Sequence, residues 1–196
     1  EGIFPTELVQ EFTACRDQVP AEPFHLVRRV VESDLGASLE SVFATFEREP
    51  IAAASIAQVH GATLRDGTPV VVKVQRPTVD DLVHNDLKVM AWLSPFLVGR
   101  IPVASLANPP ALVEVFARTI SEELDFRVEA ANMIDVAAVF ADLDQRQFVV
   151  PRPHPELVTR RVLVMERLDG FRFDDMERYE EHGVDTLAIV RASMIG

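Results

Sequence analysis

The feature that most constrains the fold is a strand-like segment with one lysine among valines. Pro69–Gln75 reads Pro-Val-Val-Val-Lys-Val-Gln, and its β-branched run predicts a strand that is buried on both faces. Ile51–Leu64 predicts the strand before it, and the intervening Arg65-Asp66-Gly67-Thr68 predicts a hairpin turn, because glycine tolerates a positive φ. Lys73 is costly to bury in such a strand without a partner. It either extends its stem to solvent or faces a cleft that holds phosphate oxygens and a carboxylate.

Helical periodicity surrounds this hairpin. The predicted helices are a segment capped by Thr6, a segment from about Pro23 that stops at Gly36, Val79–Leu97, a segment from Pro109 that continues to Leu143, and a segment from Asp174 onward. The proline-rich stretch 151–155 predicts a loop, and Val158–Glu166 predicts a strand. This order predicts an α+β fold with at most five short antiparallel strands.

Composition narrows the possible functions. The formal net charge of the 196 residues is −12, which argues against a nucleic-acid partner, because such proteins need a basic face. A local positive site for a single phosphate group remains compatible with this charge. Cys15 is the one cysteine, so an internal disulfide and a cysteine-based metal site are both excluded. No apolar run reaches the roughly 18 residues that span a bilayer.

Three further segments could carry chemistry. Ala52, Ala53, Ala54 and Ser55 would let backbone N–H groups approach an anion closely, although a tightly packed strand or turn has the same composition. Glu122, Asp125 and Glu129 have the spacing of one helical face. That face is either a solvated acidic surface, compensated in part by Arg118 and Arg127, or the source of a carboxylate for Lys73.

The third segment is Arg161–Gly170, an apolar strand that passes into a polar turn. This pattern suits a hinge between two lobes, but any buried strand that leaves a sheet has a similar pattern. The order of the segments is more informative than each alone. A small-residue loop, a hairpin, a strand lysine, a helix glutamate and a hinge strand match the parts of a kinase small lobe.

The chain resembles the UbiB family of atypical protein-kinase-like proteins. Ala52-Ala53-Ala54-Ser55-Ile56-Ala57-Gln58-Val59-His60 with Val72-Lys73-Val74-Gln75-Arg76-Pro77 carries the first part of the resemblance. Glu122-Glu123-Leu124-Asp125-Phe126-Arg127-Val128-Glu129-Ala130-Ala131-Asn132 carries the second. The resemblance implies a kinase-like small lobe with family-specific helices. The expected regions are a helical extension over residues 1–48, the lobe over 49–168, and the hinge with the start of a large lobe over 169–196.

The resemblance also implies the roles of individual residues. Residues 52–55 replace the glycine-rich loop, Lys73 contacts the nucleotide phosphates, and Glu129 forms an ion pair with Lys73. Glu123 and Asp125 belong to an acidic motif particular to the family. The residues expected to surround adenine are Met165 as gatekeeper, the Glu166 carbonyl, the Leu168 N–H, and the side chains of Val59 and Val71.

The expected function is an ATP- or ADP-binding lobe of an atypical kinase or ATPase in isoprenoid-quinone or lipid metabolism. A membrane surface, a lipid or a quinone precursor are the partners that the resemblance implies, with a cytoplasmic location peripheral to the membrane. The composition, rich in alanine, valine, arginine and aspartate, predicts a bacterial source. The family's catalytic-loop Asp and Asn and its metal-binding Asp-Phe-Gly do not follow the last predicted helix before Gly196. We therefore expect no metal ligands in this chain, Mg²⁺ ligands C-terminal to it, and no phosphotransfer by the chain alone.

Two other classes of function remain open at this point. One is a pseudokinase that binds a nucleotide or a lipid without turnover. The other is an acidic helical interaction scaffold in which Lys73 and Glu129 are only structural.

Overall fold

A computed structural model describes residues 20–98, 108–146, 148–170, 176–185 and 189. Its centre is an antiparallel sheet of β1 (Phe43–Phe46), β2 (Ala52–Ala53), β3 (Ala57–Leu64), β4 (Pro69–Gln75), β5 (Pro153–Val158) and β6 (Val162–Glu166). The order is β1-β3-β4-β6-β5, and β2 pairs with β3 beside that path. The described residues thus form six strands rather than at most five, because the two-residue β2 pairs separately from β3.

The predicted β3–β4 hairpin is present. Gly67 has a φ of 91°, and the side chain of Asp66 accepts a 2.9 Å hydrogen bond from the Thr68 N–H. Lys73 of β4 pairs with Val59 of β3 on one side and with Leu163 of β6 on the other. Lys73 therefore lies on a central strand of the sheet, as its β-branched neighbours predicted.

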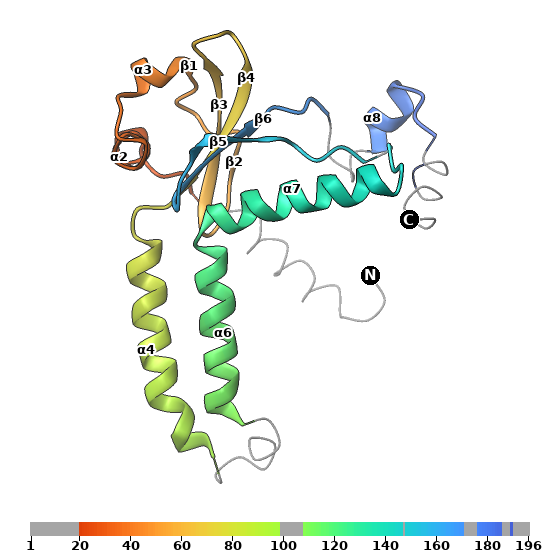
Figure 1. Cartoon of the computed structure of the whole chain (residues 1–196). Helices are drawn as coiled ribbons and strands as arrows, with labels where there is room; N and C mark the ends of the chain where they lie inside the picture. Colours follow the sequence, from red (N-terminus) through yellow and green to blue (C-terminus); the bar gives the residue numbers. More distant parts are fainter. Residues whose placement is uncertain (1–19, 99–107, 147, 171–175, 186–188, 190–196) are drawn as a thin grey trace.

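The helices are α2 (Phe24–Leu35), α3 (Leu39–Val42), α4 (Val79–Leu97), α6 (Pro109–Glu123), α7 (Phe126–Asp142) and α8 (Met176–Glu181). The bounds expected for α2 and α4 are confirmed, and α2 ends at Gly36 with a φ of 65°. Figure 1 shows α4 and α6 packed side by side and projecting away from the sheet. The two helices lie between β4 and α7 in the sequence.

Four predictions about these elements were wrong. The strands expected at Ile51–Leu64 and Val158–Glu166 are each divided: the first into β2 and β3 by the turn at 54–56, and the second by the turn at 159–161 between β5 and β6. The helix expected from Pro109 to Leu143 is broken at Leu124 and Asp125, because Leu124 is buried at a corner and Asp125 caps the second helix. The loop expected at 151–155 contributes to β5 (Pro153–Val158). Prolines are compatible with β5 because it is an edge strand, where an N–H can be missing without breaking the ladder.

The sheet has a core on each face. On one face, valines of β4 and β6 pack against α2, and this cluster comprises Val27, Val30, Val31, Leu39, Phe43, Ala62, Leu64, Val70, Val72, Val74, Val162 and Val164. On the other face, Leu163 and Ala57 pack against Phe126 and Ala130 of α7. Because Leu163 pairs with Lys73, the lysine lies on the α7 face of the sheet.

Some expectations lie outside the described residues. They include the helix capped by Thr6 and the point near Asp174 where the last helix was expected to begin. Among the residues that the structure describes, no helix combines the length and the hydropathy needed to cross a membrane.

Candidate functional site

The site is built around an ion pair between β4 and α7. The Lys73 ammonium donates to both carboxylate oxygens of Glu129, with Nζ–O distances of 2.8 and 2.7 Å. The two residues are 56 positions apart in the sequence, and their side chains are 23% and 38% exposed. Glu129, the predicted partner of Lys73, is therefore present. The pair is partly exposed to solvent and does not lie in the core.

The ammonium of Lys73 also lies over a buried aromatic ring. Lys73 Nζ lies 4.8 Å from the centroid of the Phe126 ring, and Phe126 is fully buried in the α7-face core. A cation over an aromatic face is stabilised electrostatically, more so when water is partly excluded. Phe126 is the first residue of α7, so the start of the helix, the ring and Glu129 are positioned together.

Asp125 begins α7 rather than extending an acidic helical face. It has extended backbone angles (φ −126°, ψ 96°), and its Oδ1 accepts a 3.1 Å hydrogen bond from the Arg127 N–H as a helix cap. The Arg127 guanidinium also donates to both carboxylate oxygens. These bonds lower the pKa of Asp125, while partial burial opposes the shift. The expectation that Glu122, Asp125 and Glu129 share one helical face was wrong, because the helix breaks between them.

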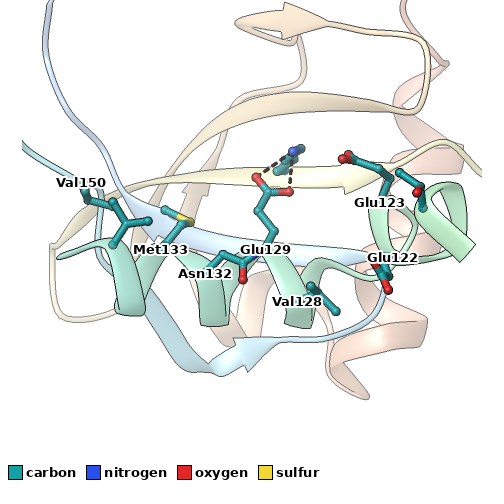
Figure 2. A pocket seen from close by; sticks show the side chains of 10 residues that line it. Glu122, Glu123, Val128, Glu129, Asn132, Met133 and Val150 are labelled. Atoms are coloured by element: carbon teal, nitrogen blue, oxygen red, sulfur yellow. Dashed lines mark hydrogen bonds and ion pairs between the residues drawn. The ribbon is translucent and has the colours of Figure 1, made fainter. Parts of the chain in front are cut away.

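A cavity of about 550 Å³ opens beside the ion pair. Its lining is Lys73, Thr119, Glu122, Glu123, Val128, Glu129, Asn132, Met133, Val136 and Val150. Figure 2 shows Glu122 and Glu123 toward one end, Met133 and Val150 toward the other, and Glu129 between them. Of the two residues predicted as an acidic motif, Glu123 lines this cavity and Asp125 does not. One ammonium group thus faces three carboxylates.

The alanine-rich segment forms a tight turn beside β3. Ala52 and Ala53 pair with Val59 and Gln58, and the Ala54 N–H donates to Ala57 O at 2.8 Å. Residues 52–55 do not line the cavity around the ion pair. The segment is therefore a two-residue strand followed by a turn, and Ala52, Ala54 and Ser55 are exposed.

Three of the other residues expected at the nucleotide share the α7 face of the sheet. Val59 pairs with Lys73, and Val71 pairs with Met165, so these three apolar side chains lie on the same face as the lysine. All three are half-buried. Glu166 is the last residue of β6, and its N–H donates to Arg152 O at 2.8 Å. Leu168 follows the strand and is 44% exposed.

Sequence reasoning assigned no role to several residues that shape the site. Phe126, Asn132 and Met133 surround the ion pair or its cavity, the Gln75 side chain bonds to the corner before α7, and the Arg76 side chain bonds to the alanine-rich turn. Phe126, Asn132, Gln75 and Arg76 all lie within the two motifs that carry the family resemblance. Their presence in those motifs was the available signal, but nothing in the spacing showed which partner each would contact.

A strand lysine paired with a glutamate from a helix across the sheet face defines a protein-kinase-like small lobe. The family model of the ABC1 atypical kinase-like domain matches residues 14–195 of the chain. The chain belongs to the ABC1 atypical kinase-like family. The predicted α+β kinase-like fold and the resemblance to UbiB proteins are thereby confirmed.

Similar proteins agree with this assignment. An uncharacterized protein of Mycobacterium tuberculosis is 37% identical over 195 residues, which cover 97% of this chain and 39% of the relative. A probable protein kinase UbiB of Pseudomonas aeruginosa is 37% identical over 192 residues, covering 95% of this chain and 35% of the relative. The chain therefore spans less than two-fifths of the length of these curated relatives.

A solved structure is also similar. It is the complex of Rv3197 from Mycobacterium tuberculosis with erythromycin, with a TM-score of 0.64 and 28% sequence identity. The match covers 90% of this chain and 44% of that chain. The likeness thus extends over nearly all of the chain and supports the kinase-like lobe as its fold.

Proposed function

We propose that this chain is the ATP- or ADP-binding lobe of an atypical kinase or ATPase. The observation that carries the proposal is the ion pair of Lys73 and Glu129 at the edge of a cavity of about 550 Å³. In kinase-like folds this pair holds the lysine where it meets the nucleotide phosphates. The lysine ammonium is held by two groups, the carboxylate of Glu129 and the ring of Phe126, so its direction is set before a ligand arrives.

The surroundings fit the base and the phosphates of a nucleotide. Val59, Val71 and Met165 form a half-buried apolar strip beside Lys73, which suits a flat aromatic base. Residues 52–55 supply the small-residue turn that a phosphate can approach. Met165 as gatekeeper, and the Glu166 carbonyl and Leu168 N–H as partners of adenine, complete the proposed set.

The carboxylates of the cavity make a divalent cation part of the proposal. Glu122, Glu123 and Glu129 would repel the phosphates of a free nucleotide, and bound Mg²⁺ supplies charge neutralisation that lowers this repulsion. Among the described residues no group of three metal-ligating side chains is assembled for a cation. We therefore propose that Mg²⁺ arrives with the nucleotide and that its protein ligands lie outside this lobe.

The biological setting proposed here rests on the family alone. Relatives bearing the name UbiB support a role of the whole protein in isoprenoid-quinone or lipid metabolism, with a quinone precursor, a lipid or a membrane surface as partner. Catalysis by the whole protein would need groups that bind Mg²⁺ and the phosphoryl acceptor. We propose that this lobe alone binds nucleotide without turning it over.

Binding without any turnover is the second candidate for the whole protein. The structural relative solved with erythromycin supports the binding part of this candidate, because that protein holds a small molecule that is not a nucleotide. The two candidates differ in whether Mg²⁺-dependent hydrolysis or transfer accompanies binding in the complete protein. An assay for ADP release from ATP, made on the complete protein, separates them.

The lysine content of the chain allows a direct test of nucleotide binding. Lys73 and Lys88 are the only two lysines in the sequence, and Lys88 lies on α4, outside the cavity that Lys73 lines. An acyl phosphate of ATP transfers its acyl group to an amine beside the bound phosphates. We expect mass spectrometry to find Lys73 labelled, with labelling suppressed by excess ATP or ADP, and Lys88 unaffected by nucleotide.

Matched variants complete this test. Lys73→Met should abolish nucleotide binding measured by calorimetry, while Lys88→Met should bind as the unaltered chain does. Thermal unfolding of both variants checks that each is folded. Equal, nucleotide-independent labelling of the two lysines, or unchanged binding by folded Lys73→Met, would refute the proposed function.

A further inference from the structure

The side chain of Arg76 joins the alanine-rich turn to the chain entering α2. Its Nε donates to Ala54 O at 2.8 Å, and its backbone N–H donates to Ile56 O at 2.9 Å. The rest of the guanidinium turns the other way, with Nη1 on Glu22 at 2.8 Å and Nη2 on Pro20 O at 2.7 Å. Its side chain is only 10% exposed. All five N–H donors of arginine lie in one plane, so a single side chain can bridge both segments.

The alanine-rich turn has little else to hold its shape. Residues 52, 54 and 55 are exposed, and their small side chains bury little apolar area. The turn contacts β3 through the two pairs of β2 and the bond from Ala54 N–H to Ala57 O. The bond from Arg76 to Ala54 O therefore acts at the tip of the turn, where the strand pairing has already ended.

The other side of this contact is fixed independently of Arg76. The Glu22 N–H donates to the side-chain oxygen of Gln58 at 2.8 Å, and Gln58 is buried on β3 with 1% exposure. Gln58 in turn contacts His60 at 2.9 Å between side-chain nitrogens. Arg76 thus connects the turn to an anchored segment rather than to a freely moving one.

From these contacts we infer that Arg76 is a positioning residue that holds the 52–55 turn in the conformation that receives nucleotide phosphates. The inference rests on the proposed nucleotide-binding function and gives a role to Arg76, which the ion pair itself does not use. Arginine is needed because an ammonium group has no planar fork and cannot reach Ala54 O, Glu22 and Pro20 O together. If Arg76 is replaced and the turn then occupies its binding conformation for about a tenth of the time, the apparent affinity for nucleotide falls about tenfold.

The test compares Arg76→Lys and Arg76→Gln with Arg28→Lys in the full chain. Arg28 is a suitable control because it forms ion pairs with Glu32 and Glu40 on α2 and α3, outside the site. Two quantities are measured: the dissociation constant for Mg²⁺–ATP by calorimetry, and amide hydrogen exchange of residues 51–57 without nucleotide. Thermal unfolding supplies the check on stability.

The expected result separates positioning from a general loss of stability. Both Arg76 variants should weaken Mg²⁺–ATP binding about tenfold and speed exchange in residues 51–57, while exchange in β4 and α7 stays as in the unaltered chain. Arg28→Lys should change neither quantity. Unchanged affinity in a folded Arg76→Gln, or faster exchange spread over the whole sheet, would overturn the inference. If the unaltered chain binds no nucleotide, the proposed function fails, and the exchange measurement still decides whether Arg76 holds the turn.

Discussion

The side-chain amide of Gln75 donates a 2.9 Å hydrogen bond to the carbonyl oxygen of Leu124, at the corner where α6 gives way to α7. Both residues are buried, with 2% and 3% exposure. Gln75 follows Lys73 by two positions on the same face of β4, and Leu124 precedes Glu129 by five. This bond therefore joins the strand and the helix that carry the ion pair, close to the pair but apart from it.

Replacing Gln75 by leucine should destabilise the chain measurably. The substitution leaves the buried carbonyl of Leu124 without its donor, and an unsatisfied buried acceptor costs about 1–3 kcal/mol. The free energy of unfolding from urea titration, monitored by circular dichroism, measures the effect. A loss below about 0.5 kcal/mol would show that the corner finds another donor or does not need one.

Replacing Glu129 by glutamine should cost less than breaking a fully buried pair. Complete burial would predict a loss of about 3–5 kcal/mol, whereas exposed pairs contribute at most about 1 kcal/mol. Because the two side chains are 23% and 38% exposed, we expect about 1–2 kcal/mol. For a chain of this length, that loss lowers Tm by roughly 2–8 °C.

The exposed pair of Asp144 and Arg146 provides the control for that substitution. Their side chains are 79% and 87% exposed, so Asp144→Asn should leave Tm nearly unchanged. A shift below about 1 °C for Glu129→Gln would contradict a stabilising ion pair at Lys73.

The chain should lose stability as pH falls below about 6.5 because of His60. His60 is buried, its Nδ1–H donates to Glu47 O at 2.9 Å, and its Nε2 must then accept from the Gln58 amide. Burial is the largest influence and lowers the pKa of His60, while the Glu47 carbonyl and the charges of Glu47 and Glu49 oppose it. The unfolded chain therefore takes up the proton first, so stability is full above the unfolded pKa and falls as pH drops toward the folded pKa.

Urea unfolding at pH 7.5, 6.5 and 5.5 measures this dependence. His60→Gln should be less stable at pH 7.5, but its stability should fall less between pH 7.5 and 5.5. An identical slope in His60→Gln would assign the pH dependence to other groups.

Neutralising Glu123 should change how nucleotide binding depends on Mg²⁺. Glu123 lines the cavity with Glu122 and Glu129, so Glu123→Gln removes one of three negative charges. We expect ADP to bind roughly two- to fivefold more tightly to the variant without Mg²⁺, with a smaller difference when Mg²⁺ is present. Calorimetry with and without Mg²⁺ checks this, and Glu114→Gln on α6, outside this cavity, is the control. Equal affinities without Mg²⁺ would place the phosphates away from Glu123.

Much of the lobe was predictable because local rules determine it. The valines around Lys73 and the glycine at position 67 specify a buried hairpin, and Gly36 ends α2 with a positive φ. Reasoning from the residues proposed the acidic run 122–129 as a source of the carboxylate for Lys73. Only the family resemblance singled out Glu129, because the two residues are 56 positions apart and no periodicity links them.

Other features depend on contacts that a linear pattern does not show. The acidic run 122–129 has continuous helical spacing, yet burial of Leu124 and capping by Asp125 break it into two helices. The prolines of 151–155 predict a loop unless the strand is known to lie at the edge of the sheet. In both cases tertiary position outweighed local preference.

The helical arm of α4 and α6 separates lysine from glutamate in sequence without separating them in space. Figure 1 shows the two helices running outward from the sheet and back, so the chain returns close to where it left. The length of such an arm does not affect the distance between the two points where the chain leaves the sheet and returns to it. Adding or removing matched turns at its far end would change the number of residues between Lys73 and Glu129 and leave their ion pair in place. The arm is therefore a part of the lobe whose length and surface can diverge among relatives while the chemistry at its base stays the same.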